Sequence, residues 1–233
     1  MKLKSIKSYN YSGYVYDLVI AKNKNFLADG VIVHNCAKKK YLLKVHNSEG
    51  VQYAKPKLKV MGLEMVRSST PHIIRQKLKD TIEIILEGNQ EVFKKYIQDY
   101  REEYNKYTVE EIAFPRGVNG MTKFSDGTGY KKGTPIHVRG ALLHNRYIKQ
   151  LKLDKTLTPI RDSDKIKFLY VSMPNPYHEN VISFLKELPK EFGLHKYIDY
   201  DLQFEKTYLS PVENIVSALG WSIDTSATLD EFF

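Results

Sequence analysis

The triplet His34-Asn35-Cys36 carries the chemical groups that are needed to cleave a peptide bond without water. The side-chain amide of Asn35 can attack its own main-chain carbonyl, which closes a succinimide ring and releases the chain that follows. His34 can act as the acid that protonates the leaving nitrogen. Cys36 is a nucleophile that can accept an acyl group as a thioester before that release. Taken alone, the triplet is more simply a buried cysteine beside a chance His-Asn pair.

Strand-forming segments precede this triplet and must position it. Residues 14–20 and 31–33 are β-branched and aromatic, which is typical of β-strands. Gly13 and the Asp-Gly pair at 29–30 supply turns between them. Residues 1–35 show no helical periodicity, and so short an all-β segment cannot bury a hydrophobic core alone. We therefore expect this segment to dock onto another chain.

Three sequence segments follow one another up to Cys36: Tyr-Asp-Leu-Val-Ile at 16–20, Asn-Phe-Leu-Ala-Asp-Gly at 25–30, and Val-Ile-Val-His-Asn-Cys at 31–36. They resemble the two carboxy-terminal motifs of inteins, and the first residue lies about where naturally split inteins are divided. The resemblance implies that residues 1–35 are the C-terminal half of a split intein. This half would complete a β-rich intein fold, and splice in trans, with a separate chain that carries the N-terminal half.

The same resemblance assigns catalytic roles to four residues of this sequence. It implies that Asn35 cyclises with the help of His34. It also implies that Cys36 is the first residue of the retained segment, and that Asp17 helps to coordinate the two cleavages.

One position departs from the intein pattern. Many inteins have a histidine directly before the counterpart of Asn25-Phe26, where it assists the cyclisation of asparagine, and this chain has Lys24. Either Lys24, Asn23 or a residue of the partner chain replaces that histidine, or Lys24 is a solvated charge at a strand edge. The departure leaves open whether this segment can splice.

Three consecutive lysines lie shortly after the junction between Asn35 and Cys36, directly before a predicted β-hairpin. Lys38–Lys40 stand next to Tyr41, and such a cluster can neutralise phosphates and reach the edge of a DNA groove. Strand-like residues at 41–45 and 51–54 flank a turn sequence, which indicates the hairpin. A run of lysines by itself is more simply a solvated face.

Helical periodicity begins after this hairpin. Thr70 can cap a helix and Pro71 suits its first position, and apolar residues then recur every four residues until Gly88, where we expect the helix to end. A second helix is predicted over residues 90–104, so the two form a helical hairpin. Residues 114–135 are rich in glycine and lysine and are predicted to be a loop.

Three further elements are predicted in the remainder of the chain. Residues 136–151 are expected to be helical, and residues 165–171 to form a strand. A final helix is predicted over 204–219, interrupted or restarted at Pro211.

Five further segments follow Cys36 in this order: Lys-Lys-Lys-Tyr at 38–41, Lys-Leu-Lys-Val-Met-Gly-Leu-Glu at 57–64, Ser-Ser-Thr-Pro at 68–71, the segment from His137 to Asn145, and Asn-Pro-Tyr at 175–177. They resemble the region that follows the palm in bacteriophage-type family B DNA polymerases. The resemblance implies that residues 36–221 form a largely helical thumb domain, with a β-hairpin, that grips primer–template DNA. The residues to which it assigns DNA contacts are Lys38, Lys39, Lys40, Tyr41, His137, Arg139 and Asn145. A helix-end salt bridge is the alternative for Arg139.

Residues 222–233 are expected to form a flexible tail. Leu229, Phe232 and Phe233 can fill a hydrophobic pocket on a partner, and the segment resembles the sliding-clamp-binding tail of the same polymerases. Packing of the two aromatic rings on their own domain is the alternative.

The sequence lacks the fixed pair of carboxylates that nucleotidyl transfer by two metal ions requires. Asp162-Ser163-Asp164 and Asp199-Tyr200-Asp201 are more simply a turn and a helix entry. We therefore expect no metal or cofactor in this chain, and expect the catalytic aspartates with their Mg²⁺ on the partner chain. Ligation at Cys36 would then rebuild a DNA-directed DNA polymerase, which is a nucleotidyltransferase.

The composition is that of a basic globular protein. The chain has 36 Lys and Arg against 27 Asp and Glu, a net charge of +9, which suits a partner that carries phosphates. A single cysteine excludes an internal disulfide and a multi-cysteine zinc site. We expect no membrane partner and a cytoplasmic location, because the sequence has neither a long apolar stretch nor a signal peptide.

The sequence therefore predicts an α+β chain in three parts, with boundaries at 1–35, 36–221 and 222–233. The first hypothesis is a precursor that delivers the thumb and clamp-binding end of a replicative polymerase by trans-splicing. The second is an accessory subunit that docks on the polymerase core and DNA without splicing. The third is an unrelated basic nucleic-acid-binding protein with a β-rich extension.

Overall fold

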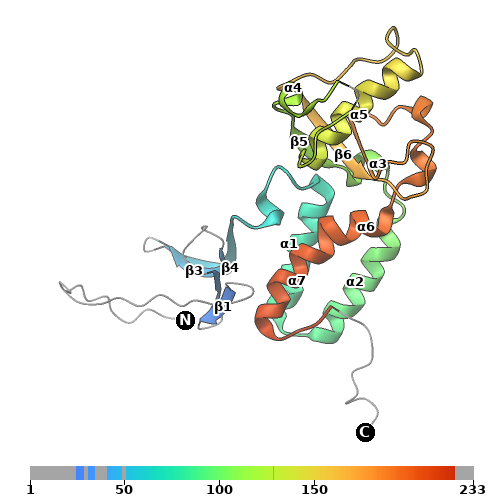
Figure 1. Ribbon diagram of the computed structural model, residues 1–233. Helices are drawn as coiled ribbons and strands as arrows, with labels where there is room; N and C mark the ends of the chain where they lie inside the picture. The colour runs from blue at the N-terminus through green and yellow to red at the C-terminus, as the bar shows by residue number, and fades with distance from the viewer. Residues whose placement is uncertain (1–24, 29–30, 35–40, 49–50, 128, 224–233) are drawn as a thin grey trace, which may run out of the picture.

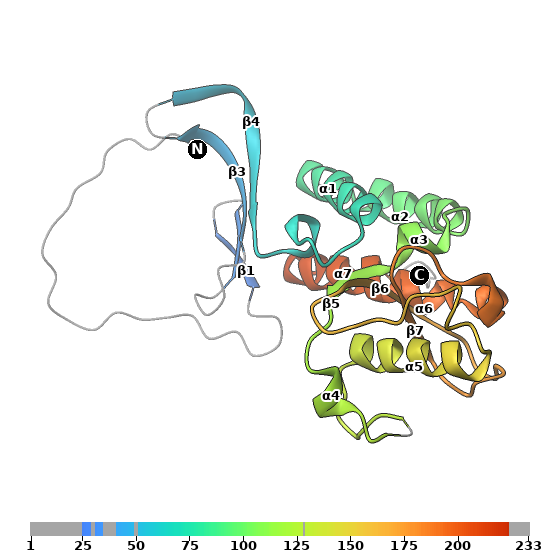
Figure 2. The ribbon, with the colours of Figure 1, turned by 90° about the horizontal axis from the view of Figure 1, so that it is seen from above.

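The computed structural model describes residues 25–28, 31–34, 41–48, 51–127 and 129–223. A β-hairpin projects beside a helical lobe, and a second lobe built on a small sheet lies at one end of the helices (Figure 1, Figure 2). Helices and two antiparallel sheets occur together, which is compatible with the predicted α+β class. Within the described ranges, no helix is long and apolar enough to cross a membrane.

The N-terminal sheet has four antiparallel strands that follow one another in chain order. β1 (Asn25–Ala28) pairs with β2 (Val31–His34), and β2 pairs with the start of β3 (Tyr41–Ser48). β3 and β4 (Val51–Met61) form a long hairpin. This confirms the predicted hairpin, and β4 extends well beyond the predicted end of its strand.

The helical lobe begins with the predicted helical hairpin, α1 (His72–Glu87) and α2 (Gln90–Tyr104). Gly88 ends α1 with a left-handed φ of 79°, which a residue without a Cβ adopts readily. The predicted capping role of Thr70 is wrong. Pro71, with φ −54° and ψ 143°, occupies the N-cap position itself, so that α1 starts one residue later and has no side-chain cap.

A nearly continuous C-terminal helix completes this lobe. It consists of α6 (Tyr200–Phe204), the π-helical segment η4 (Glu205–Leu209) and α7 (Ser210–Val216). The helix starts earlier than predicted, and Asp199 caps it by accepting a hydrogen bond from the amide of Leu202. Pro211 stands near the start of α7, directly after the π-helical segment η4.

The second lobe contains β5 (Phe114–Gly117), β6 (Lys165–Tyr170) and β7 (Val181–Phe184) in one antiparallel sheet, with α5 (Ile136–Gln150) packed against β7. α5 and β6 confirm the predicted helix and strand. Gly140 allows α5 to approach β7 closely, because a side chain there would collide with Ser183. The remaining short helices are η1 (Glu64–Val66), α3 (Val109–Ile112), α4 (Met121–Phe124), η2 (Lys190–Phe192), η3 (His195–Tyr197) and η5 (Ser217–Leu219).

The prediction that residues 114–135 form a loop is wrong in part. β5 and α4 both lie within this range. β5 is only four residues long and includes Pro115, so it shows no alternation that marks a strand. Its formation depends on pairing with β6, from Phe114–Phe168 to Gly117–Lys165, and those partners are distant in the sequence.

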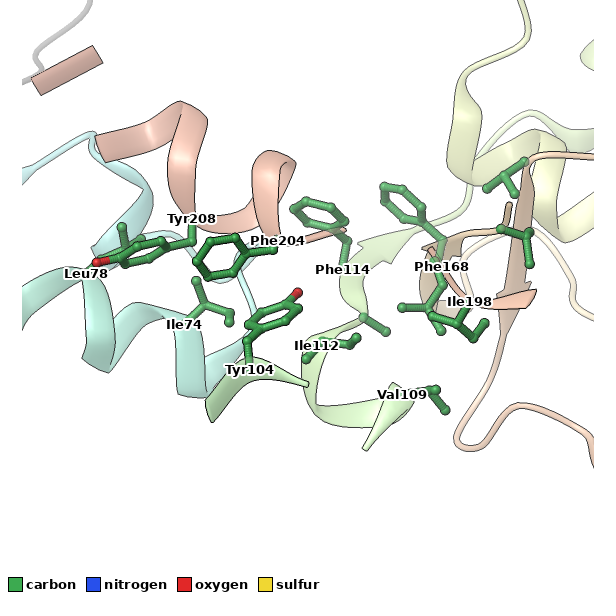
Figure 3. Close-up of a cluster of buried hydrophobic side chains, with 14 of the residues drawn as sticks. Ile74, Leu78, Tyr104, Val109, Ile112, Phe114, Phe168, Ile198, Phe204 and Tyr208 are labelled. Carbon is green, nitrogen blue, oxygen red and sulfur yellow. The ribbon is translucent and has the colours of Figure 1, made fainter. Parts of the chain in front are cut away.

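One hydrophobic core runs through both lobes (Figure 3). In the helical lobe, Tyr104 packs edge-on against Phe204, with ring centroids 4.9 Å apart. In the second lobe, Phe114 and Phe168 stack at 5.0 Å. All four side chains belong to the same buried cluster, so the two lobes are joined by packed side chains as well as by the chain itself.

Candidate nucleic-acid interface

A cleft of about 320 Å³ lies where the two lobes meet. The helical lobe contributes residues just before α1 and residues of the C-terminal helix, whereas the second lobe contributes β5, β6 and the start of α5. The polar and charged residues that line it are Glu64, Arg67, Ser69, Thr70, Arg116, His137, Tyr170, Lys206 and Thr207. Three permanent cations therefore share one cleft with a single carboxylate.

Arg116 of β5 is fixed in this cleft by contacts on two sides. Its Nη1 donates hydrogen bonds to the carbonyl oxygens of Ser69, at 2.5 Å, and Pro115, at 2.9 Å. Its guanidinium lies 5.5 Å from the ring centre of Phe114 and 5.9 Å from that of Phe168, which are cation–π distances. Burial lowers the pKa of Arg116, and Arg67 lowers it further. Because an arginine pKa starts far above neutrality, the group remains a cation.

The other two cations of the cleft are more exposed. Arg67 lies 3.5 Å from Glu64 in an ion pair, and Lys206 lies 2.7 Å from Glu205. Exposed pairs of this kind contribute little stability and exchange partners readily. Both cations can therefore turn toward an anion that enters the cleft.

His137 and Tyr170 complete the electrostatic environment. Burial lowers the pKa of His137, and the positive charge of Arg116 lowers it further. Burial raises the pKa of Tyr170, whereas Lys206 and Arg116 oppose that rise. Near neutral pH the histidine is therefore neutral and the phenol protonated, and both can form hydrogen bonds to a ligand.

The predicted DNA-binding residues of α5 separate in the structure. His137 lines the cleft. Arg139 instead hydrogen-bonds the side chain of Asn180 and stands over the ring of Tyr130 at 5.4 Å. Its Nε atom is buried and has no hydrogen-bond partner among the described residues. Within the same residues Arg139 forms no ion pair, so the helix-end salt bridge is not seen there.

Asn145 has a structural contact. Its Nδ2 donates to the carbonyl oxygen of Ile160 at 2.8 Å, and its Oδ1 accepts from the amide of the same residue at 2.7 Å. This pair of bonds fastens α5 to the segment that precedes β6. A DNA contact by Asn145 stays a prediction, and it would have to coexist with both bonds.

The remaining predicted residues are only partly described. Tyr41 begins β3, where it is half-buried and pairs with Met61, and His34 ends β2 opposite Asn25. The predicted residues that lie outside the described ranges are Asp17, Asn35, Cys36, Lys38, Lys39, Lys40, Leu229, Phe232 and Phe233. Of the described residues, no three His, Cys, Asp or Glu side chains gather in a way that could hold a metal ion.

Sequence reasoning missed the cations that the fold brings together. Arg67, Arg116 and Lys206 are isolated in the sequence and form no charged run. The Phe-Pro-Arg-Gly sequence around Arg116 lies in the stretch predicted as a loop. Only the proximity to Ser68-Ser69-Thr70-Pro71, a segment of the polymerase resemblance, could have indicated Arg67.

Comparison with known proteins identifies sequence relatives of this chain. No family model matches the chain. The DNA-directed DNA polymerase of Enterobacteria phage T4 is 31% identical over 203 residues, and that of Escherichia phage RB69 is 32% identical over 201 residues. A DNA polymerase of Thermococcus aggregans is 26% identical over 264 aligned residues, which cover 95% of this chain and 13% of that protein.

The two phage matches have the same extent. Each covers 84% of this chain but only 22% of the relative, so the chain spans about a fifth of the length of the polymerases it matches. Over 84% of its length, the chain is thus homologous to a segment of the DNA-directed DNA polymerases of phages T4 and RB69.

Proposed function

We propose that residues 36–221 supply the thumb of a DNA-directed DNA polymerase, and that the cleft between the two lobes binds a backbone phosphate of primer–template DNA. The observation that carries this proposal is the convergence of Arg67, Arg116 and Lys206 on one cleft. Phosphate contacts supply a large share of the affinity of proteins for DNA, and arginine and lysine are among the residues that make them. The homology to phage polymerases supports DNA as the source of that phosphate.

The arrangement of Arg116 favours a rigid phosphate contact. Its Nη1 is held by Ser69 and Pro115, and the two aromatic rings confine the guanidinium plane. The donors on Nε and Nη2 have no partner among the described hydrogen bonds, so they can face an anion. A guanidinium that is held in place loses little side-chain entropy when it binds phosphate.

Binding of the full chain to a labelled primer–template duplex, measured over a series of salt concentrations, tests this proposal. Arg116→Gln should weaken binding. It should also reduce the salt-dependence slope, which is the slope of the logarithm of the binding constant against the logarithm of the salt concentration, by about 0.9, the value for one lost phosphate contact. Arg101→Gln is a matched control, because Arg101 is also an arginine near an aromatic ring, at 5.6 Å from Phe204, and does not line the cleft. Equal effects of the two changes, or no effect of Arg116→Gln, would remove the cleft from the interface.

The proposal extends to the first 35 residues, which act as the C-terminal half of a split intein. The support is their sequence pattern and the extent of one alignment. The match to the Thermococcus aggregans polymerase covers 95% of 233 residues, which leaves about 12 unmatched. It therefore includes at least about 23 of residues 1–35, and one polymerase chain aligns with both parts.

The partner chain carries the acyl group as a thioester or ester on the first residue of its intein half. The thiol of Cys36 displaces that residue and takes the acyl group as a new thioester, and Asn35 then cyclises, which breaks the Asn35–Cys36 peptide bond and releases residues 1–35. The amine of Cys36 that this frees takes the acyl group from its own sulfur and forms the new peptide bond. The catalytic aspartates and their Mg²⁺ belong to the partner chain, and residues 222–233 bind a sliding clamp. The accessory subunit is the second candidate, favoured by Lys24 in place of the usual histidine. Peptide mass spectrometry of the native polymerase separates the two. Foreign residues joined to Cys36 indicate splicing, whereas an intact Val33-His34-Asn35-Cys36 peptide indicates the accessory subunit.

A further inference from the structure

Three lysines form a stripe along one face of β4. Lys55, Lys57 and Lys59 alternate with other residues, and side chains two apart in a strand point to the same face. All three are exposed. We call them the lysine stripe. The hairpin that carries the stripe projects beside the helical lobe (Figure 1, Figure 2).

The opposite face of the hairpin anchors it to the protein. Leu42 of β3 is only 2% exposed, and Leu58 and Val60 of β4 pack against the main hydrophobic core. These residues alternate with the lysines, so burial of one face turns the other face to solvent. The orientation of the lysine stripe is thus set by the core.

The described strand residues of this hairpin carry only positive formal charge. The described residues of β3 and β4 include four lysines and no aspartate or glutamate. Lys57 lies directly opposite Val45 and stands 4.2 Å from the ring centre of Tyr53, which shares its face. Lysines that only decorate a surface are usually interspersed with acidic residues. An acid-free stripe beside an aromatic ring instead fits a polyanion.

We infer that the lysine stripe is a second contact surface for the sugar–phosphate backbone of the primer–template duplex, separate from the cleft. This inference rests on the proposed function. β4 leads through η1 directly to Arg67 at the edge of the cleft, so the two basic surfaces are consecutive along the chain. Successive lysines are spaced by about 6.8 Å along the strand, which equals two steps of about 3.4 Å along B-DNA.

A competing explanation is protection of the sheet edge. β4 is an edge strand of its sheet, and Pro56 stands between two of the lysines. Lysine and proline on an edge strand prevent pairing with another chain. This explanation predicts a change in self-association on removal of the charges, and no change in DNA binding.

Replacement of all three lysines of the stripe by glutamine in the full chain tests the inference. In duplex binding over a salt series, we expect weaker binding and a slope reduced by up to about 2.7, or about 0.9 for each lost phosphate contact. The matched control is Lys79→Gln, Lys95→Gln and Lys106→Gln, the same loss of charge at three exposed lysines on and just after the helical hairpin. A conservative Lys55→Arg, Lys57→Arg and Lys59→Arg variant should retain the parental slope.

Each other outcome overturns the inference in a recognisable way. Equal slope changes in the stripe and control variants would mean that net charge alone matters. An unchanged slope with new self-association in sedimentation would assign the lysines to edge protection. An unchanged slope with lost binding to the catalytic partner chain would assign them to an acidic surface of that chain. If the parent chain itself shows no salt-dependent duplex binding, the proposed function fails first.

Discussion

Arg116 donates a hydrogen bond of 2.5 Å to the carbonyl oxygen of Ser69, a residue 47 positions earlier in the chain. The bond joins β5 of the second lobe to the segment that leads into α1 of the helical lobe. The cation that we propose as a phosphate contact therefore also fixes the distance across the cleft. Arg116 thus has a role in phosphate binding and a role in stability, and separate measurements can test the two.

Arg116→Lys keeps the positive charge but loses the planar guanidinium. We expect the free energy of unfolding in urea to fall by about 1.5 to 3 kcal/mol, the range for a hydrogen bond to a charged group. The salt-dependence slope of duplex binding should stay near that of the parent, because one cation remains. A slope as low as that of Arg116→Gln would show that the guanidinium geometry, and not only its charge, is required.

The buried hydroxyls of Thr81 and Tyr208 lie 2.6 Å apart, and removal of one should cost less stability than removal of the other. Thr81 also donates to the carbonyl oxygen of Lys77, so it remains partnered in Tyr208→Phe, and we expect a loss of about 0.5 to 1.5 kcal/mol. Thr81→Val leaves the Tyr208 hydroxyl buried without a partner and should cost about 1 to 3 kcal/mol. Urea denaturation of both variants and of the double variant checks this order. Because Thr81 gives its one proton to Lys77, the Tyr208 hydroxyl is the donor between the two, and a larger loss for Tyr208→Phe would contradict this direction.

Asn145→Ala should destabilise the protein without altering the DNA interface. It leaves the amide and carbonyl of Ile160, a residue only 2% exposed, without their side-chain partners. The expected loss is at least about 2 kcal/mol, since two buried polar groups are affected. At a temperature where the variant is folded, the salt-dependence slope of its duplex binding should equal that of the parent chain. A reduced slope would instead support the direct DNA contact predicted for Asn145.

Duplex binding and stability should depend oppositely on pH below about 6.5, the ordinary histidine value. Burial lowers the pKa of His137 and of His144 in the folded protein. The unfolded chain therefore takes up protons first, so stability falls as the pH drops from about 6.5 toward the folded pKa values. A phosphate in the cleft favours protonated His137, which should tighten binding over the same range. His137→Gln should abolish the tightening, and its persistence would exclude His137 from the contact.

Cys36→Ala should abolish ligation of this chain to its partner, because the chain has no other cysteine. The measurement is gel and mass analysis of a mixture with the N-terminal chain. Asn35→Ala is the companion variant, expected to block the release of residues 1–35. A ligated product from Cys36→Ala would contradict the thioester mechanism.

Local periodicity explains the elements that could be predicted from the sequence. Ile74, Leu78 and Ile82 recur every four residues, and all three are at most 1% exposed in α1. The same reasoning located α2, α5 and β6, because each has a periodic pattern within its own length. The predicted helix start at Pro71 is wrong by one position, because the sequence does not show whether proline takes the N-cap or the first turn.

Non-local contacts explain what could not be predicted. β5 is stabilised by pairing with a strand about fifty residues away, and its own four residues carry no pattern. The cleft likewise depends on a meeting of Arg67, Arg116 and Lys206 that only the tertiary fold produces. Of the residues predicted on α5, the fold sends His137 to the cleft and Asn145 to a structural contact, although both lie on one helix.

The shared core has a consequence for the order in which the chain folds during synthesis. Phe204 and Tyr208 complete the cluster that Ile74 and Leu78 begin, and they come from the other end of the described chain (Figure 3). Thr81 of α1 and its hydrogen-bond partner Tyr208, for example, are 127 positions apart. The apolar face of α1 therefore lacks part of its cover until α6 and η4 have left the ribosome, and the helical lobe should not close before then.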